Sequence, residues 1–202
     1  MSPDALKQLS EGYRKIRNTA RYILSNINDF DPNKDMVSFE DMTELDKWAL
    51  MRLDSLIDKV NEGYNAFDFH IAFHAIHNFC VTDMSNFYLD IIKDRLYCEK
   101  EDSEVRRAAQ TAMYRILSAV ARLAAPIISF TAEEIWTYMP HTSTDDKESI
   151  FLNQMPEKSG IEFSDEFVSK WEFIYSTRET VNKVLEEKRN EKLIGKSLEA
   201  NI

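Results

Sequence analysis

The stretch that decides the fold lies near the N-terminus and reads Tyr13-Arg14-Lys15-Ile16-Arg17-Asn18-Thr19-Ala20-Arg21-Tyr22. Around it, apolar residues recur at alternating steps of three and four, which is the spacing of one helical face. These residues are Leu6, Leu9, Tyr13, Ile16, Ala20, Ile23 and Ile27. The pattern predicts a helix over about residues 4–25 with this face buried, ended by the turn-forming residues 26–32.

Four cationic and two neutral polar side chains gather on one flank of the same predicted helix. They lie at about 40 to 140° around the helix axis from Tyr13 if each residue turns the helix by 100°. This set, termed the cationic flank, consists of Lys7, Arg14, Arg17, Asn18, Arg21 and Ser25. Only one acid, Glu11, stands near it. Guanidinium groups offer paired donors to an anion. They can equally pair with acids of neighbouring helices, and the spacing alone does not decide between these two interpretations.

The charge of the chain is strongly segregated. The 202 residues, enough for one domain, contain 25 Lys and Arg against 35 Asp and Glu, a net charge of −10. Residues 1–25 hold five basic and two acidic side chains, so this segment carries +3 and the remainder −13. Because the overall field repels phosphate, the net charge argues against indiscriminate nucleic-acid binding, but it does not exclude a local cationic patch.

Two cysteines, Cys80 and Cys98, suggest neither a disulfide framework nor a four-ligand zinc site, so we expect reduced thiols. No run of about 18 apolar residues is present. Lys7 and Glu11 interrupt any hydrophobic core of a signal peptide. These features predict a cytoplasmic protein without a membrane span.

Helical periodicity continues along the chain, and four glycines and five prolines leave little turn chemistry for an all-β fold. A capping-box pattern at residues 43–46 opens a second helix. Its inward face is Leu45, Ala49, Leu53, Leu56, Val60, Tyr64 and Phe67. A third helix follows over about residues 68–97, with room for a break near Thr82. Its inward face is Phe69, Phe73, Ile76, Cys80, Phe87 and Ile91.

A fourth helix is predicted from an N-cap at Ser103 to the stop at Pro126. Its buried stripe is Val105, Ala109, Ala112, Ile116, Val120 and Leu123. Arg107, Arg115 and Arg122 share another face, which is a second candidate cationic stripe. For this stripe we favour interhelical salt bridges over anion binding.

The C-terminal third begins with a second capping-box pattern, at residues 131–134, before a short helix to Met139. Residues 140–163 are polar and irregular, and we expect a mobile loop with one strand-like run at 149–152. A last helix begins at Ser164 and continues to about Lys192. The sum is an all-α antiparallel bundle of about five to six helices. We expect a single domain over 1–202, with the core bundle at about 4–139 and a C-terminal helical segment at about 164–194.

Three motifs only superficially resemble functional sites. His70, His74 and His77 have metal-like spacing, but the surrounding aromatics favour histidines at the edge of a core. Gly195-Lys196-Ser197 resembles the end of a phosphate-binding loop, yet Asn190 stands where the first glycine is required and no strand precedes it. Residues 26–32 lack the glycine and final glutamate of a calcium loop. No nucleophile motif is recognisable, so we predict no catalytic and no metal-ligating residues.

The chain resembles the anticodon-binding domain of bacterial-type isoleucyl-tRNA synthetases. The resemblance is carried by the decamer quoted above and by five further runs in the same order. These are residues 26–32 (NINDFDP), 74–80 (HAIHNFC), 87–97 (FYLDIIKDRLY), 129–136 (SFTAEEIW) and 189–200 (RNEKLIGKSLEA). The run Arg-Asn-Thr-x-Arg followed by Asn-Asp-Phe-Asp-Pro favours the isoleucine enzymes over their valine, leucine and methionine relatives.

The resemblance implies a binding module and not an enzyme, because the His-Ile-Gly-His-like and Lys-Met-Ser-Lys-Ser-like signatures of the catalytic fold do not occur in this chain. The editing domain and the cysteine-rich zinc module are also absent, so ATP and zinc would belong to other parts of the parent protein. The chain then corresponds to an excised C-terminal helical domain that stops before a further small module. Its expected partners are the anticodon stem-loop of isoleucine tRNA and the catalytic body of the same parent, with the domain itself monomeric.

On this interpretation the cationic flank contacts tRNA. We expect Arg14 and Arg17 to bind phosphates or stack on base planes, Asn18 to read a base edge, and Arg21 and Lys7 to extend the patch. Two alternatives remain open. The first is a helical protein–protein scaffold without RNA binding, and the second is a metal-dependent enzyme built on the histidine row.

Overall fold

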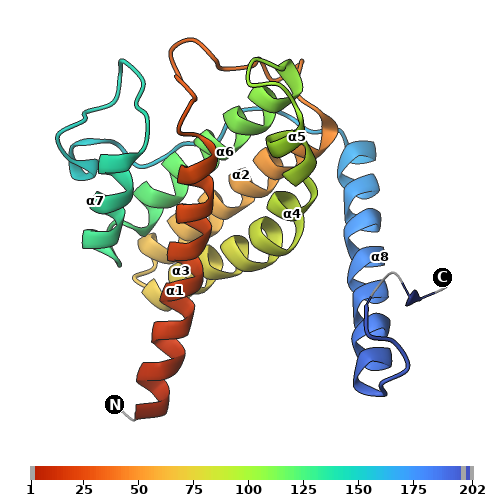
Figure 1. The fold of residues 1–202 in the computed structure, drawn as a ribbon. Coiled ribbons are helices and arrows are strands. Elements are labelled where there is room, and N and C mark those ends of the chain that lie inside the picture. Colours follow the sequence, from red (N-terminus) through yellow and green to blue (C-terminus); the bar gives the residue numbers. More distant parts are fainter. Residues whose placement is uncertain (1–2, 197–198, 201–202) are drawn as a thin grey trace. The chain divides into compact units, whose positions relative to one another are not determined.

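The computed structural model describes residues 3–196, 199 and 200 of the chain, and it is all-α in this part (Figure 1). The predicted fold class is confirmed. The chain divides into two compact units, residues 1–160 and 161–202, each of which is described by itself. The organisation as a single domain stays a prediction. No helix in the described ranges is both long enough and apolar enough to span a membrane.

The first unit contains most of the helices. They are α1 (Pro3–Asn26), α2 (Glu44–Asn65), α3 (Phe69–Asn78), the π-helix η1 (Phe79–Tyr88), α4 (Leu89–Ile91), α5 (Lys93–Cys98), α6 (Glu104–Ala124), α7 (Ser129–Tyr138) and the 3₁₀ turn η2 (Ile150–Leu152). The second unit contains α8 (Asp165–Asn190). The predicted helices are therefore present, with the third one divided into four pieces.

Helix α6 is the centre of the first unit, with α1, α2, α5 and α7 packed around it (Figure 1). From Ala108 to Ala124 every side chain is buried except those of Arg115 and Arg122, which are half-buried. A helix that is buried all round must satisfy its polar groups internally. Gln110 does so by donating to the Asn26 carbonyl at 2.9 Å. Val105, predicted to be buried, is 41 % exposed because it lies in the first turn, before α6 enters the core.

The predicted third helix changes its hydrogen-bonding pattern at Phe79, where a π-helix of ten residues begins. Each π turn contains more residues than an α turn, so the inward face shifts along the sequence. As a result Leu89 and Ile92 are buried, while Ile91 is 46 % exposed. The prediction that Ile91 faces inward was wrong for this reason.

The junction between α2 and α3 exposes two aromatic rings that were predicted to be buried. Phe67 follows the end of α2 with a positive φ of 59° and is 79 % exposed, and Phe69 is 51 % exposed. Just before the junction the two helices approach closely, because a Cβ on Gly63 would lie 3.2 Å from the backbone nitrogen of Ala72. Gly63 therefore permits this close helix crossing as well as weakening the last turn of α2.

A buried carboxylate joins the start of α2 to η1 and α5. Asp46 is fully buried and accepts hydrogen bonds from the Tyr88 hydroxyl at 2.6 Å and from Arg95 Nη1 at 2.8 Å. The predicted N-cap at Thr43 is confirmed, since its side chain accepts from the Asp46 backbone nitrogen at 3.4 Å. The prediction of a second capping box at residues 131–134 was wrong. Helix α7 begins at Ser129, so Thr131 lies inside the helix.

The segment 140–163 is irregular, as predicted, apart from η2 at the position of the strand-like run. The prediction of a strand-like conformation there was wrong. Side-chain hydrogen bonds hold this segment at several points. The Trp136 indole donates to the Asp146 carbonyl at 2.9 Å, and the Ser159 backbone nitrogen donates to Asp54 at 2.9 Å.

The second unit begins as predicted, with Ser164 capping α8 by accepting a hydrogen bond from the Phe167 backbone nitrogen at 3.2 Å. The rings of Phe167 and Trp171 follow one helical turn apart, with centroids 6.2 Å from each other. After α8 the backbone nitrogen of Gly195 donates to Glu199 at 2.7 Å, and no strand lies before this glycine in the described part of the chain. Ser197, the last residue of the Gly-Lys-Ser motif, lies outside the described residues.

Candidate functional site

The buried face of α1 is formed by Ile16, Ala20 and Ile23 and is continued by Ile27 directly after the helix, each at most 3 % exposed. The cationic flank lies beside this face, and all six of its side chains are exposed. The inward pattern fails at the N-terminal end, where Leu6 and Leu9 are 55 % and 49 % exposed. The predicted placement of the flank is therefore confirmed, while the buried stripe is shorter than predicted.

Among the described residues, Arg17 is the one cation of the flank with an acid partner within ion-pair distance. Arg17 Nη2 lies 3.8 Å from Oε1 of Glu134 on α7, and both side chains are about half exposed. Within residues 3–196, Lys7, Arg14 and Arg21 form no ion pair. Exposed guanidinium and ammonium groups that lack an acid partner retain their full capacity to bind an anion.

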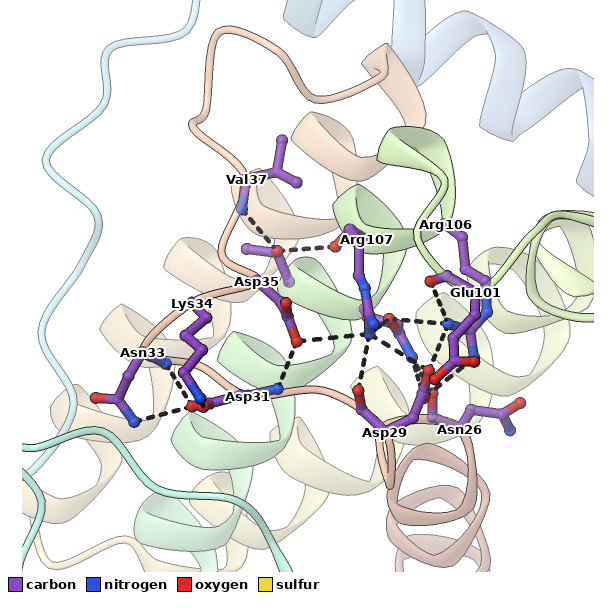
Figure 2. Close-up of polar contacts among 12 residues, drawn as sticks. Asn26, Asp29, Asp31, Asn33, Lys34, Asp35, Val37, Glu101, Arg106 and Arg107 are labelled. Carbon is purple, nitrogen blue, oxygen red and sulfur yellow. Dashed lines mark hydrogen bonds and ion pairs between the residues drawn. The ribbon is translucent and has the colours of Figure 1, made fainter.

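The second cationic stripe, on α6, behaves differently. Figure 2 shows Arg106 and Arg107 converging on Asp29 in the loop after α1. The Asp29 carboxylate accepts from Arg106 Nη1 at 2.7 Å and Nη2 at 3.1 Å, and from Gln110 Nε2 at 2.7 Å. Arg107 Nη1 donates to the Asp29 carbonyl at 2.9 Å and lies 3.7 Å from Asp35. The salt bridge predicted for this stripe is therefore confirmed for Arg107, but its acid partners lie in the loop after α1 and not on another helix.

Burial raises the pKa of the Asp29 carboxyl, but hydrogen bonds from Arg106 and Gln110 outweigh this effect and hold the pKa below its ordinary value. Asp29 is thus ionised at neutral pH and its charge is neutralised by α6. Sequence reasoning missed Arg106, which lies outside the stripe. The density of Asp and Asn in residues 26–35 was the available signal that this loop holds partners for basic residues.

The salt-bridge prediction is wrong for the other two arginines of the stripe, Arg115 and Arg122, which form no ion pair in the described part of the chain. Arg122 donates to the Ser118 carbonyl at 3.1 Å and to the Ser118 hydroxyl at 3.0 Å, so two of its donors are used within its own helix. Its burial lowers the pKa of the guanidinium from the ordinary value. Arg115 is half-buried beside it and forms no ion pair in the described part of the chain.

The loop of residues 26–35 is a plain connection tied by its own side chains (Figure 2). Asp31 accepts from the backbone nitrogen of Asn33 at 3.0 Å and from Lys34 at 2.9 Å. The hydrogen bond from Lys34 is the main reason that the pKa of Asp31 falls to about 2. The carboxylates that would form a calcium site are thus engaged by protein donors.

The histidine row forms no metal site among the described residues, where no three His, Cys, Asp or Glu side chains converge. His70 and His74 are exposed, and the ring of His77 stacks on Phe73 with centroids 6.5 Å apart. This packing supports the interpretation of histidines at the edge of a core. Both cysteines are free, and burial raises the pKa of the Cys80 thiol to about 12, so that thiol is unreactive.

A groove of about 170 Å³ runs between α1 and α7 beside the cationic flank. It is lined by Arg17, Ala20, Arg21, Leu24, Thr131, Glu134, Ile135 and Tyr138. The hydroxyls of Tyr13 and Thr131 are hydrogen-bonded 2.8 Å apart and fix α1 to α7 at one end. The Thr131 hydroxyl therefore forms a hydrogen bond between two helices, whereas it was predicted to cap the start of α7.

Comparisons with known proteins agree, the family model over residues 46–202 and the relatives over the whole chain. A family model described as the anticodon-binding domain of tRNA ligase matches residues 46–202. The isoleucine–tRNA ligases of Caldanaerobacter subterraneus subsp. tengcongensis and Caldicellulosiruptor bescii are 47 % and 51 % identical over 201 and 203 residues. That of Syntrophotalea carbinolica is 47 % identical over 207 residues. Each comparison covers 100 % of this chain, α1 included, and 22 % of the relative, so the chain spans about a fifth of the length of these ligases.

Proposed function

The chain belongs to the family of anticodon-binding domains of tRNA ligases, and from this premise we propose that it binds the anticodon stem-loop of an isoleucine tRNA through the cationic flank of α1. The observation that carries the proposal is the contrast between two sets of arginines. Arg106 and Arg107 on α6 are committed to Asp29, whereas Arg14 and Arg21 on α1 are exposed and form no ion pair in the described residues.

The electrostatics of the chain fit this role. A net charge of −10 repels RNA from most of the surface, while α1 presents a local excess of cations. An anticodon loop offers closely spaced phosphates and unstacked bases, which arginines can bind with paired donors or cover with their planes. Arg14, Arg17 and Arg21 serve in these contacts, and Lys7 extends them. Asn18, exposed between the arginines, supplies the donor and acceptor pair that a base edge requires.

The chain would act as one part of a larger ligase that attaches isoleucine to its tRNA in the cytoplasm. In this proposal the catalytic body, together with its ATP and zinc sites, belongs to parts of the parent protein outside these 202 residues. The chain itself is a monomeric binding module without catalytic activity. Because it would hold only part of the tRNA contact, its own binding is weak and depends strongly on salt.

The experiment is a fluorescence-anisotropy titration of a labelled isoleucine tRNA anticodon stem-loop at about 50 and 200 mM salt, which spans the range over which phosphate contacts weaken markedly. A duplex hairpin of equal charge with a closed tetraloop is the control. We expect measurable binding of the stem-loop at low salt, loss of at least tenfold in affinity at high salt, and weaker binding of the control hairpin. A protein–protein scaffold would show no binding of either RNA, and that result would contradict the proposal.

A further inference from the structure

We infer that the groove between α1 and α7 receives a single unstacked nucleobase of the bound RNA, with the ring of Tyr138 as its stacking surface. The inference rests on the proposed function and deepens it, because it assigns a second kind of contact, to a base, beside the phosphate contacts of the cationic flank.

The groove is built by matching faces of two helices. On α1 it is lined at positions i, i+3, i+4 and i+7 by Arg17, Ala20, Arg21 and Leu24, and on α7 at the same spacing by Thr131, Glu134, Ile135 and Tyr138. Residues at this spacing share one helical face. The groove is therefore a continuous surface of regular helices and not an irregular gap between loops.

Contacts between the two helices fix one end of the groove. Tyr13 is hydrogen-bonded to Thr131 at 2.8 Å, and one turn further along α1 Arg17 lies 3.8 Å from Glu134. Beyond these two contacts, no hydrogen bond or ion pair joins α1 to α7 among residues 3–196. The ring of Tyr138, at the last residue of α7, is 73 % exposed. The two helices are thus joined by polar contacts at one end of the groove, and the groove is open to solvent at the other end, beside Tyr138.

The chemistry of the groove suits an uncharged flat ring. Its interior is apolar, formed by Ala20, Leu24, Ile135 and the Tyr138 ring, and charges occur only at its edge. At about 170 Å³ it is smaller than the roughly 300 Å³ at which pockets for whole small molecules begin. Unstacked bases bind in such places by stacking on an aromatic ring, while arginines hold the adjoining phosphates.

The charges at the edge distinguish a base from other occupants. Arg17 and Arg21 stand on the α1 side, where they can reach the phosphates on either side of an inserted base. Glu134 stands on the α7 side and repels phosphate, so the backbone of the RNA is directed to the α1 side and the base to the interior. An apolar side chain of a protein partner would gain nothing from this pair of guanidinium groups.

Three variants on α7 test the inference by stem-loop titration at low salt. Tyr138→Ala removes the stacking ring and should weaken binding about tenfold, whereas Tyr138→Phe keeps the ring and should bind as the wild type does. Phe130→Ala is the matched control, because Phe130 is an aromatic residue of the same helix that is 95 % exposed and does not line the groove. Its affinity should remain that of the wild type. Since both rings are largely exposed, all three variants should unfold at wild-type urea concentrations.

A second arm locates the base. Stem-loops with an abasic site at each loop position in turn are titrated against the wild type and Tyr138→Ala. One abasic position should weaken wild-type binding about tenfold and have no further effect on Tyr138→Ala. If the wild type binds the stem-loop but Tyr138→Ala binds it equally well, the inference is overturned while the proposed function stands. If the wild type does not bind the stem-loop at low salt, both are overturned.

Discussion

Arg17 of α1 and Glu134 of α7 face each other across the groove between these helices, with Nη2 and Oε1 3.8 Å apart. Their side chains are 44 % and 53 % exposed, so water and salt screen the pair and it contributes at most about 1 kcal/mol to folding. On the proposed function, the pair should matter more for RNA binding than for stability, because Glu134 would compete with phosphate for the guanidinium group of Arg17.

Glu134→Gln should release Arg17 for phosphate contact. We expect stem-loop affinity to rise a few-fold and the slope of log affinity against log salt to steepen by up to about 0.9, the value for one additional phosphate contact. The free energy of unfolding should change by less than about 1 kcal/mol. Anisotropy titrations at four salt concentrations and urea unfolding measure the two effects. Weaker binding of Glu134→Gln would show instead that Glu134 orients Arg17 for contact.

Asp46 is the most deeply buried carboxylate among the described residues, at 0 % exposure, and depends on Arg95 and Tyr88. Asp46→Ala leaves the Arg95 guanidinium, whose side chain is only 17 % exposed, without its carboxylate partner and should lower the free energy of unfolding by about 3–5 kcal/mol. Tyr88→Phe removes one hydrogen bond to a charged group and should cost about 1.5–3 kcal/mol. The control is Lys93→Ala in the exposed pair of Lys93 with Asp90, which should leave the free energy of unfolding almost unchanged.

Urea unfolding monitored by circular dichroism gives all three values. Similar losses for Asp46→Ala and Lys93→Ala would contradict the view that the Asp46 cluster joins α2 to α5 and η1.

Asp29 should make stability depend on pH in the acid range. Because its folded-state pKa lies below the ordinary 3.8, its stabilising contribution is complete above that value and is lost as the pH falls through the folded-state pKa. Asp29→Asn imitates the protonated form. The variant should be less stable than the wild type by about 1.5–3 kcal/mol at pH 7, and the difference should shrink below about pH 3.8. Urea unfolding of both proteins between pH 7 and 3 measures this, and a difference that stays constant would refute it.

Local patterns in the sequence predicted the α1 and α8 boundaries, the Thr43 cap and the position of the cationic flank, because these depend on spacing within one helix. Cys80 and Phe87 are buried as predicted, but Ile91 was misplaced because the π-helix of residues 79–88 shifts the register before it, and no helical spacing rule signals a π-helix. Thr131 shows a second limit. Its hydroxyl fits a capping box by pattern, yet in the structure it binds Tyr13, a residue 118 positions away.

The acidic partners of the arginines could not be predicted from the sequence alone either. Arg17 and Arg107 have the same side chain and both lie beside a buried helical face. Only the folded chain shows that Arg107 meets Asp29 and Asp35, while Arg17 has one distant partner, Glu134. A decision between salt bridge and ligand contact requires knowing which acids the fold brings near each arginine, and these acids lie far away in sequence.

The most direct test of the account is the salt dependence of stem-loop binding by Arg14→Ala/Arg21→Ala, measured beside Lys59→Ala. Lys59 is exposed on α2 and forms no ion pair in the described residues, so it is a control for loss of a surface charge. We expect the double variant to bind at least tenfold more weakly at low salt, with a salt slope flatter by about 1.4 to 1.8, while Lys59→Ala retains wild-type affinity and slope. Equal affinity and slope for the wild type and the double variant would contradict the assignment of the cationic flank as the RNA-binding face.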